Sequence, residues 1–244
     1  MRNTYDPRQE LCMSEQIRLY DWAPSPFSFK VRAVLEYKGL AYTRATILGP
    51  ALFAVRRRGK IGKAPALEIG GHLFVDSTDI VYELEKRFPD PPVIPKAPRE
   101  WALCHALEEW SDEALYFVGL YYQWFEAEGR KMVPQAFGRG VLARAAYEYY
   151  KRVVLKQIKG HGTSRKPPEH VRSDLKRHLD AIAALVNPGP FLLGDKPFLC
   201  DFAVAGQLVY LGRTPVGGRL LAEQPAIDAY RNRLKGLRKS QRTG

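Results

Sequence analysis

Two serines at a predicted helix start, Ser25 and Ser28, have side chains that could handle an anion. Ser25 precedes Pro26, and a Ser-Pro pair is typical of a helix start. Serine can accept a hydrogen bond from an unpaired backbone N–H, and proline has no N–H to leave unpaired. Because a helix N-terminus carries partial positive charge, a hydroxyl placed there is suited to holding an anion.

Two further motifs could contribute to the same chemistry. Lys63-Ala64-Pro65 stands at the start of a predicted strand, and Asp76-Ser77 stands at the start of a second predicted helix. The second motif again combines a polar side chain with a helix N-terminus, which suits a carboxylate. The three motifs are far apart in the chain, so their chemistry depends on the elements that bring them together.

These elements predict an α/β domain over residues 17–88. A strand, a helix and a second strand follow one another at the lengths of a βαβ unit, which implies a parallel pair of strands. Gly70-Gly71 is a hairpin signal between two more strands. The predicted strands cover 17–22, 41–47, 64–69 and 72–75, and the predicted helices cover 25–38 and 76–88, with a short helix within 49–63.

The first predicted helix should have one apolar face, with its charged residues off that face. Gly39 is suited to ending the helix, because glycine readily adopts the left-handed conformation found there. The apolar residues are Phe27, Val31, Val34 and Leu35, and the charged residues are Lys30, Arg32, Glu36 and Lys38.

A proline-rich linker over 89–98 separates this domain from an all-helical domain over 99–235. Apolar residues recur there at helical spacing. Residues 1–16 are expected to form a loose arm, partly an extension before Met13, and residues 236–244 a basic tail. The predicted helices cover 104–125, 133–158, 171–186, 201–211 and 226–234, with a basic loop over 160–168.

Composition and motifs narrow the function classes. No apolar run approaches the roughly 20 residues that span a bilayer, no signal pattern opens the chain, and the three cysteines are scattered, so we expect a cytoplasmic protein. Serine-hydrolase and phosphate-loop motifs are absent, and the histidines lack metal-ligand spacing, so no metal is expected. The charge of +12 fits a solvated basic surface, or contacts with nucleic acid or anionic molecules, although no nucleic-acid motif is present.

In this order, and followed by a helical domain, the three motifs resemble those of the glutathione transferase superfamily. Residues 191–197 with Asp201-Phe202-Ala203 resemble the signature segment of its helical domain. The resemblance covers roughly residues 17–235 and implies a thioredoxin-like domain followed by an all-helical bundle. Phe198 departs from the family pattern, because a Ser or Thr there usually forms a capping box with Asp201.

The resemblance implies a role for each motif. Pro65 matches the family's cis-proline, and Ala64 would then present its backbone N–H and C=O to the cysteinyl part of glutathione. Asp76 and Ser77 match an acidic-serine pair that holds the γ-glutamyl carboxylate, with Ser77 also capping its helix. Lys63 lies where some classes keep a lysine near the glycyl carboxylate.

Ser25 matches the serine or cysteine that acts on the glutathione sulfur. A free thiol has a pKa of about 8.5. A hydrogen bond to a charged group contributes about 1.5–3 kcal/mol, so one hydroxyl with a helix N-terminus could lower this pKa by roughly one to two units. Ser28 as the working hydroxyl, or a purely capping role for Ser25, are the alternatives.

The predicted function is that of a serine-type glutathione transferase or isomerase acting on a small hydrophobic electrophile, and the resemblance also implies a homodimer. The alternative is a non-catalytic module of the same fold whose basic surface contacts protein or nucleic acid. An aromatic stripe at helical spacing is more often core than pocket. The candidate cleft residues are Phe27, Tyr116, Tyr121, Tyr122 and Trp124.

Overall fold

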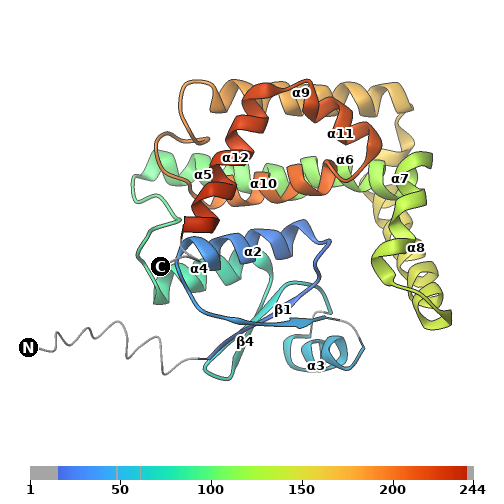
Figure 1. The fold of residues 1–244 in the computed structure, drawn as a ribbon, viewed down its shortest axis with the longest axis horizontal. Helices are drawn as coiled ribbons and strands as arrows, with labels where there is room; N and C mark the ends of the chain where they lie inside the picture. The colour runs from blue at the N-terminus through green and yellow to red at the C-terminus, as the bar shows by residue number, and fades with distance from the viewer. Residues whose placement is uncertain (1–15, 48, 61, 241–244) are drawn as a thin grey trace, which may run out of the picture. The chain divides into compact units, whose positions relative to one another are not determined.

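The computed structural model describes residues 16–47, 49–60 and 62–240, which fall into two compact units (Figure 1). Unit 1 runs to Ile94 and includes the segment from Gly236, and unit 2 is Pro95–Lys235. The expected arm before residue 16 and the last four residues of the expected tail lie outside the described residues. The predicted fold class is confirmed: an α/β domain precedes a helical one. Among the described helices, none combines the length and apolar content that a membrane crossing requires.

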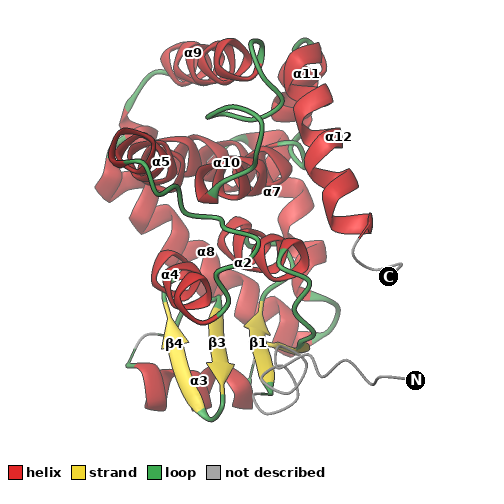
Figure 2. Ribbon diagram, turned by 90° about the vertical axis from the view of Figure 1, so that its left-hand side faces the viewer, coloured by secondary structure: helices red, strands yellow, loops and turns green. Residues whose placement is uncertain are grey.

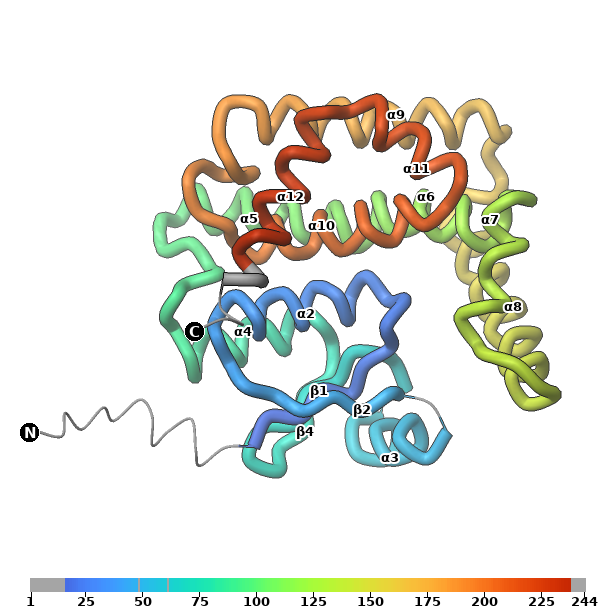
Figure 3. Tube along the Cα trace, in the orientation of Figure 1, coloured from blue at the N-terminus to red at the C-terminus, as the bar shows by residue number. Residues whose placement is uncertain are grey.

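A four-stranded sheet in the order β2-β1-β3-β4 forms the centre of unit 1. β1 (Ile17–Asp21) pairs in parallel with β2 (Thr43–Thr46), which lies beside it in Figure 3. β3 (Ala66–Ile69) runs antiparallel to β1 and forms a hairpin with β4 (His72–Val75). Gly70 and Gly71 have φ of +54° and +82°, as the hairpin requires. The predicted parallel pair and hairpin are therefore confirmed.

Helices cover both faces of this sheet (Figures 1 and 2). α2 (Pro26–Tyr37) and α4 (Ser77–Arg87) lie on one face, and α3 (Pro50–Gly59) lies on the other. Gly39, with φ of +68°, ends α2 as predicted. Beneath α3 the buried cluster consists of Tyr20, Ile47, Val55 and Ala66.

The charged residues of α2 are buried, which the sequence did not predict. Val31, Val34 and Leu35 are fully buried as expected, and Lys30, Arg32, Glu36 and Lys38 are also buried. The aliphatic part of a long charged side chain can be buried while its charged end group reaches an oppositely charged or hydrogen-bonding partner. Arg32 Nη1 lies 2.5 Å from Oδ1 of buried Asp21 at the end of β1, and Arg44 Nε donates to Oδ2 of the same carboxylate at 2.8 Å.

Lys38 ties the proline-rich segment to α2 and α4. Its Nζ donates to Glu85 Oε2 at 2.7 Å, to the Phe88 carbonyl at 2.7 Å and to the Pro91 carbonyl at 2.8 Å, which uses all three ammonium protons. Burial lowers the pKa of Lys38, and Glu85 opposes that shift. These three partners, on α4 and the proline-rich segment, compensate for removing the charge from water.

Unit 2 opens with a nearly continuous helix. It consists of α5 (Pro98–Trp110), the π-helical turn η1 (Ser111–Leu115), α6 (Tyr116–Leu120) and the π-helical turn η2 (Tyr121–Phe125). The helix predicted over 104–125 thus ends as expected and starts six residues earlier.

The next helix is wrongly predicted at its start. Instead of one helix from 133, the chain forms α7 (Ala127–Met132) and the 3₁₀ turn η3 (Val133–Phe137), and only then α8 (Val141–His161). Gly138 and Gly140 have φ of +86° and +103°. A positive φ is incompatible with a right-handed helix, so the chain cannot continue as one helix through these two residues. The remaining helical elements are the 3₁₀ turn η4 (Thr163–Arg165), α9 (Pro168–Val186), α10 (Leu199–Leu211), α11 (Pro215–Ala222) and α12 (Pro225–Ser240).

The sequence did not predict α11, because Gly217 and Gly218 weaken its helical pattern. Thr214 caps this helix by accepting from the Gly217 N–H at 3.0 Å, and Pro215 follows as its first residue. A Cβ at Gly217 would lie 2.4 Å from the Leu211 carbonyl oxygen. Glycine is needed here for close packing rather than for a turn.

Asp201 organises the C-terminal helices despite the missing cap at Phe198. Its fully buried carboxylate accepts hydrogen bonds from the N–H groups of Phe198 and Leu192, both at 2.9 Å, and from the Tyr230 hydroxyl at 3.0 Å. One half of the capping box therefore persists, and donors from two other segments join it. Burial raises the pKa of Asp201 to about 6, although these hydrogen bonds act in the opposite direction.

Because this pKa is raised above about 3.9 for an unfolded chain, ionisation of Asp201 lowers stability as pH rises to about 6. Tyr230→Phe removes a donor to the ionised form, so we expect it to lower the free energy of unfolding by about 1.5–3 kcal/mol near pH 8 and by about 1 kcal/mol near pH 4.5. Urea unfolding at both pH values measures this. Tyr149→Phe, at an exposed hydroxyl, is the control, and equal losses at both pH values would contradict the assignment.

A glycine pair tests the packing of α7 on η2. A Cβ at Gly129 would lie 1.8 Å from the Tyr122 carbonyl oxygen, whereas a Cβ at Gly160 in α8 meets nothing within 4 Å. We expect Gly129→Ala to destabilise by more than about 3 kcal/mol or to prevent folding. The same substitution at Gly160 should stabilise by about 0.5–1 kcal/mol. Thermal and urea unfolding compare the two, and similar effects would show that the contact at Gly129 is not tight.

Candidate functional site

The sheet register brings the three predicted motifs to one end of unit 1. Tyr20 in β1 is opposite Ala66 in β3, and Ala66 is opposite Val75 in β4. Because β1 and β4 both run antiparallel to β3, their C-terminal ends lie beside the N-terminal end of β3. The segments that leave or enter the sheet at this end carry Ser25, Ala64-Pro65 and Asp76-Ser77.

Ser25 caps α2, as predicted. Its backbone is extended (φ −70°, ψ 129°), and its Oγ accepts from the Ser28 N–H at 3.2 Å. Ser28 is fully buried, and its own Oγ accepts from the Trp22 N–H at 3.3 Å, so it secures the turn between β1 and α2. Ser25 is 7% exposed. Since its oxygen acts as an acceptor, the Ser25 O–H proton is the group suited to donation to an anion, and burial makes Ser28 the weaker candidate.

The Ala64–Pro65 peptide bond is cis, which confirms that prediction. Pro65 is buried directly before β3, Ala64 is partly exposed, and Lys63 is exposed. The backbone of Ala64 therefore stands at the end of the sheet, next in sequence to the strand that β1 and β4 flank.

Asp76, rather than Ser77, is the cap of α4. Asp76 Oδ1 accepts from the Thr78 N–H at 2.9 Å, and its φ of +76° turns the chain from β4 into the helix. Ser77 is the first helical residue and is 5% exposed. The expectation that Ser77 caps this helix is thus wrong, because the carboxylate one position earlier makes the capping hydrogen bond.

Lys30 brings a positive charge that sequence analysis missed. Its Nζ donates to Thr78 Oγ1 at 3.2 Å, which joins α2 to the first turn of α4. The lysine follows Ser25 by five residues, and only the packing of the two helices reveals its position. A buried ammonium and two helix N-termini make this end of unit 1 favourable for anionic groups.

The predicted aromatic cleft residues are largely buried. Tyr121, Tyr122 and Trp124 are each less than 5% exposed. Trp124 Nε1 donates to the Tyr210 hydroxyl at 3.2 Å, and its ring stacks on Tyr147, so these contacts make Trp124 part of the packing of unit 2. Phe27 and Tyr116 are partly exposed.

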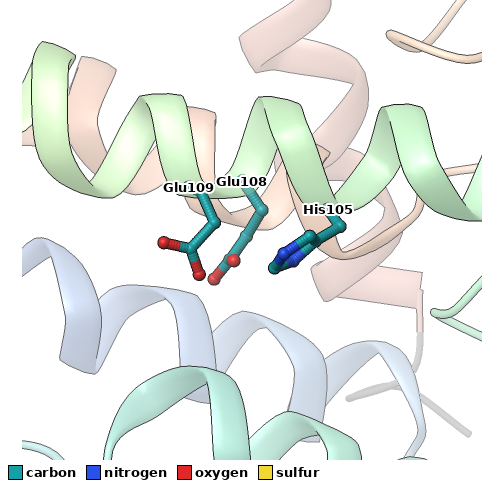
Figure 4. A group of neighbouring side chains, drawn as sticks. All are labelled: His105, Glu108 and Glu109. Atoms are coloured by element: carbon teal, nitrogen blue, oxygen red, sulfur yellow. The ribbon is translucent and has the colours of Figure 1, made fainter.

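Three side chains of the metal-ligand types converge on α5 (Figure 4). The ligand atoms of His105, Glu108 and Glu109 lie within 4.8 Å of one another, because positions three and four residues apart share a helix face. Glu108 is buried, whereas the other two are exposed, and His105 stacks on Trp101. One helix supplies the whole group, so we assign no metal to it.

Comparisons with known proteins show which sequences this chain is similar to. Residues 19–92 match the family model for the glutathione S-transferase N-terminal domain. The chain is 22% identical to isoprene-epoxide–glutathione S-transferase of Rhodococcus sp. (strain AD45) over 242 residues, which cover 90% of this chain and 98% of that protein.

Solved structures agree on the fold. The crystal structure of beta-etherase LigF from Sphingobium sp. strain SYK-6 matches 93% of this chain and 98% of its own, with a TM-score of 0.69 and 19% identity. A glutathione S-transferase from Methylobacterium radiotolerans, solved with glutathione sulfonate, matches 90% of each chain with a TM-score of 0.62 and 24% identity. The predicted resemblance to the glutathione transferase superfamily is confirmed.

The cap at Ser25 predicts a stability difference between two substitutions. Ser25→Ala removes the acceptor for the Ser28 N–H and should lower the free energy of unfolding by about 1 kcal/mol. Ser25→Asp restores an acceptor and should stay within about 0.5 kcal/mol of the native chain. Urea unfolding measures both, and equal losses would mean that the capping bond contributes little.

Proposed function

We propose that this chain, which has the fold of the glutathione transferases, is a glutathione-dependent transferase or isomerase of the serine type. The convergence of Ser25, Ala64-Pro65 and Asp76-Ser77 at one end of the sheet carries this proposal. The match of residues 19–92 to the glutathione S-transferase N-terminal domain supports glutathione as the co-substrate.

Each motif receives one part of the tripeptide in this proposal. The backbone N–H and C=O of Ala64, set by cis-Pro65, bind the cysteinyl unit. Ser77 and the N–H groups at the start of α4 bind the γ-glutamyl carboxylate, with Asp76 as cap. Lys63 lies near the glycyl carboxylate, where its exposed ammonium supplies the opposite charge.

The Ser25 hydroxyl donates a hydrogen bond to the glutathione sulfur. Together with the N-terminus of α2, this bond favours thiolate and lowers the thiol pKa by roughly one to two units. The thiolate attacks an electrophilic carbon, the new C–S bond takes the sulfur electron pair, and the leaving group departs with its own pair. In isomerisation, the thiolate adds and is then expelled.

The second substrate is a small hydrophobic electrophile. The candidate contacts are Phe27, Tyr116, Tyr121, Tyr122 and Trp124, of which Phe27 and Tyr116 are partly exposed and the other three are buried. A homodimer and a cytoplasmic location complete the proposal. The relative from Rhodococcus is named for an epoxide substrate, and this name supports a small electrophilic molecule as the substrate class.

Glutathione calorimetry and ultraviolet titration of the bound thiolate test the role of Ser25. We expect the native protein to bind glutathione with a thiol pKa roughly one to two units below about 8.5. Ser25→Ala should still bind but should return the pKa towards that value and lower turnover of an activated aryl halide roughly ten- to thirty-fold near pH 7.

Ser28→Ala is the matched control, because it deletes the same group from the buried neighbour and should leave the thiol pKa lowered. Loss of the shift in Ser28→Ala but not in Ser25→Ala would reassign the working hydroxyl. A native chain that binds no glutathione would overturn the proposal and favour the non-catalytic alternative.

A further inference from the structure

Helix α8 has exposed apolar side chains that are not packed in the core of unit 2. Leu142 is 87% exposed, Val141 85%, Tyr149 64% and Val153 37%. Leu142, Tyr149 and Val153 are separated by seven and then four residues, so they form one stripe along the helix. Figures 1 and 3 show the N-terminal half of α8 extending beyond the other long helices of unit 2.

The opposite face of α8 already provides its packing. Val154 and Ile158 are buried, and the rings of Tyr147 and Tyr150 contact Phe137. The helix is thus held in unit 2 by one face, and the exposed stripe makes no contribution to that core. Aliphatic side chains exposed to this degree in a row mark a surface suited to an apolar partner.

Basic side chains flank one edge of this stripe. At about 100° of rotation per residue, Arg152, Lys156 and Lys159 lie beside it on one side, whereas Arg144, two residues after Leu142, faces the other way. Residues 139–159 contain six basic side chains and one acidic side chain, Glu148, whose carboxylate lies 3.2 Å from Lys151 Nζ. Within the described part of the chain, no carboxylate forms a salt bridge with the remaining five. They are Arg139, Arg144, Arg152, Lys156 and Lys159.

We propose that α8 is a docking surface for an anionic lipid bilayer. An amphipathic helix with basic residues beside an apolar stripe lies in a membrane interface, where apolar side chains enter the acyl boundary and cations meet lipid phosphates. The aliphatic stripe favours a bilayer over nucleic acid, whose backbone offers only charge to Leu142 and Val153. The convex exposed helix presents a row of side chains rather than a groove, which suits a flat partner.

Vesicle co-sedimentation of the full chain tests this surface. We expect binding to vesicles of 70% phosphatidylcholine and 30% phosphatidylglycerol, weakened by salt, and little binding to phosphatidylcholine alone. Each basic residue at an anionic surface contributes roughly five-fold to partitioning, so removing three should lower it on the order of 100-fold. The triple variant is Arg152→Gln, Lys156→Gln and Lys159→Gln.

The charge-matched control removes three exposed basic residues from α9 and should lower partitioning only a few-fold. It consists of Arg172→Gln, Lys176→Gln and Arg177→Gln. A second pair of variants tests the apolar contribution. Leu142→Ser leaves the charge unchanged and should lower partitioning about ten-fold, whereas Leu185→Ser on α9 should not lower it. Circular dichroism verifies that every variant is folded.

Four results would overturn the proposal. The first is equal loss in the α8 and α9 triple variants, which would indicate a general charge effect. The second is full binding by Leu142→Ser, and the third is binding of duplex DNA without binding of vesicles. The fourth is sedimentation showing that the α8 substitutions dissociate a dimer while vesicle binding is unchanged, which would make this face a contact between copies of the chain.

Discussion

The pairing of β1 and β4 on either side of β3 is the constraint on which the candidate site depends. A register shift of one residue would exchange the faces of a strand and separate the motifs that now leave the sheet together. The hairpin at Gly70-Gly71 sets the pairing of β3 with β4. The buried cluster that includes Tyr20, Val55 and Ala66 stabilises the pairing of β1 with β3. The chemistry of this end therefore follows from backbone pairing and apolar burial.

Buried charges secure the connections between elements in both units. Asp21 holds Arg32 of α2 to the end of β1, directly before the turn that carries Ser25, and Lys38 holds the proline-rich segment. In unit 2, Asp201 joins α10 and α12. Burying a charge is unfavourable unless it is paired and hydrogen-bonded, so each of these groups favours the one arrangement that supplies its partners.

The two units distribute polarity differently. Unit 1 gathers hydroxyl groups, helix N-termini and a buried ammonium at one end of its sheet, which suits a polar, anionic ligand. Unit 2 places its aromatic rings in packing contacts, such as Trp124 with Tyr147 and Tyr210, and leaves aliphatic side chains of α8 exposed. The proposed glutathione site thus lies in unit 1, and the proposed docking surface lies in unit 2.

The sequence by itself determined the βαβ unit, the hairpin, the cap at Ser25 and most helices, because local spacing and turn residues carry those signals. Tertiary structure alone decided which strand ends meet, and it placed Lys30 beside Thr78 and the Tyr230 hydroxyl on Asp201. It also made α11 a helix despite its glycines. These features depend on groups far apart in the chain, whose contact energies no local pattern encodes.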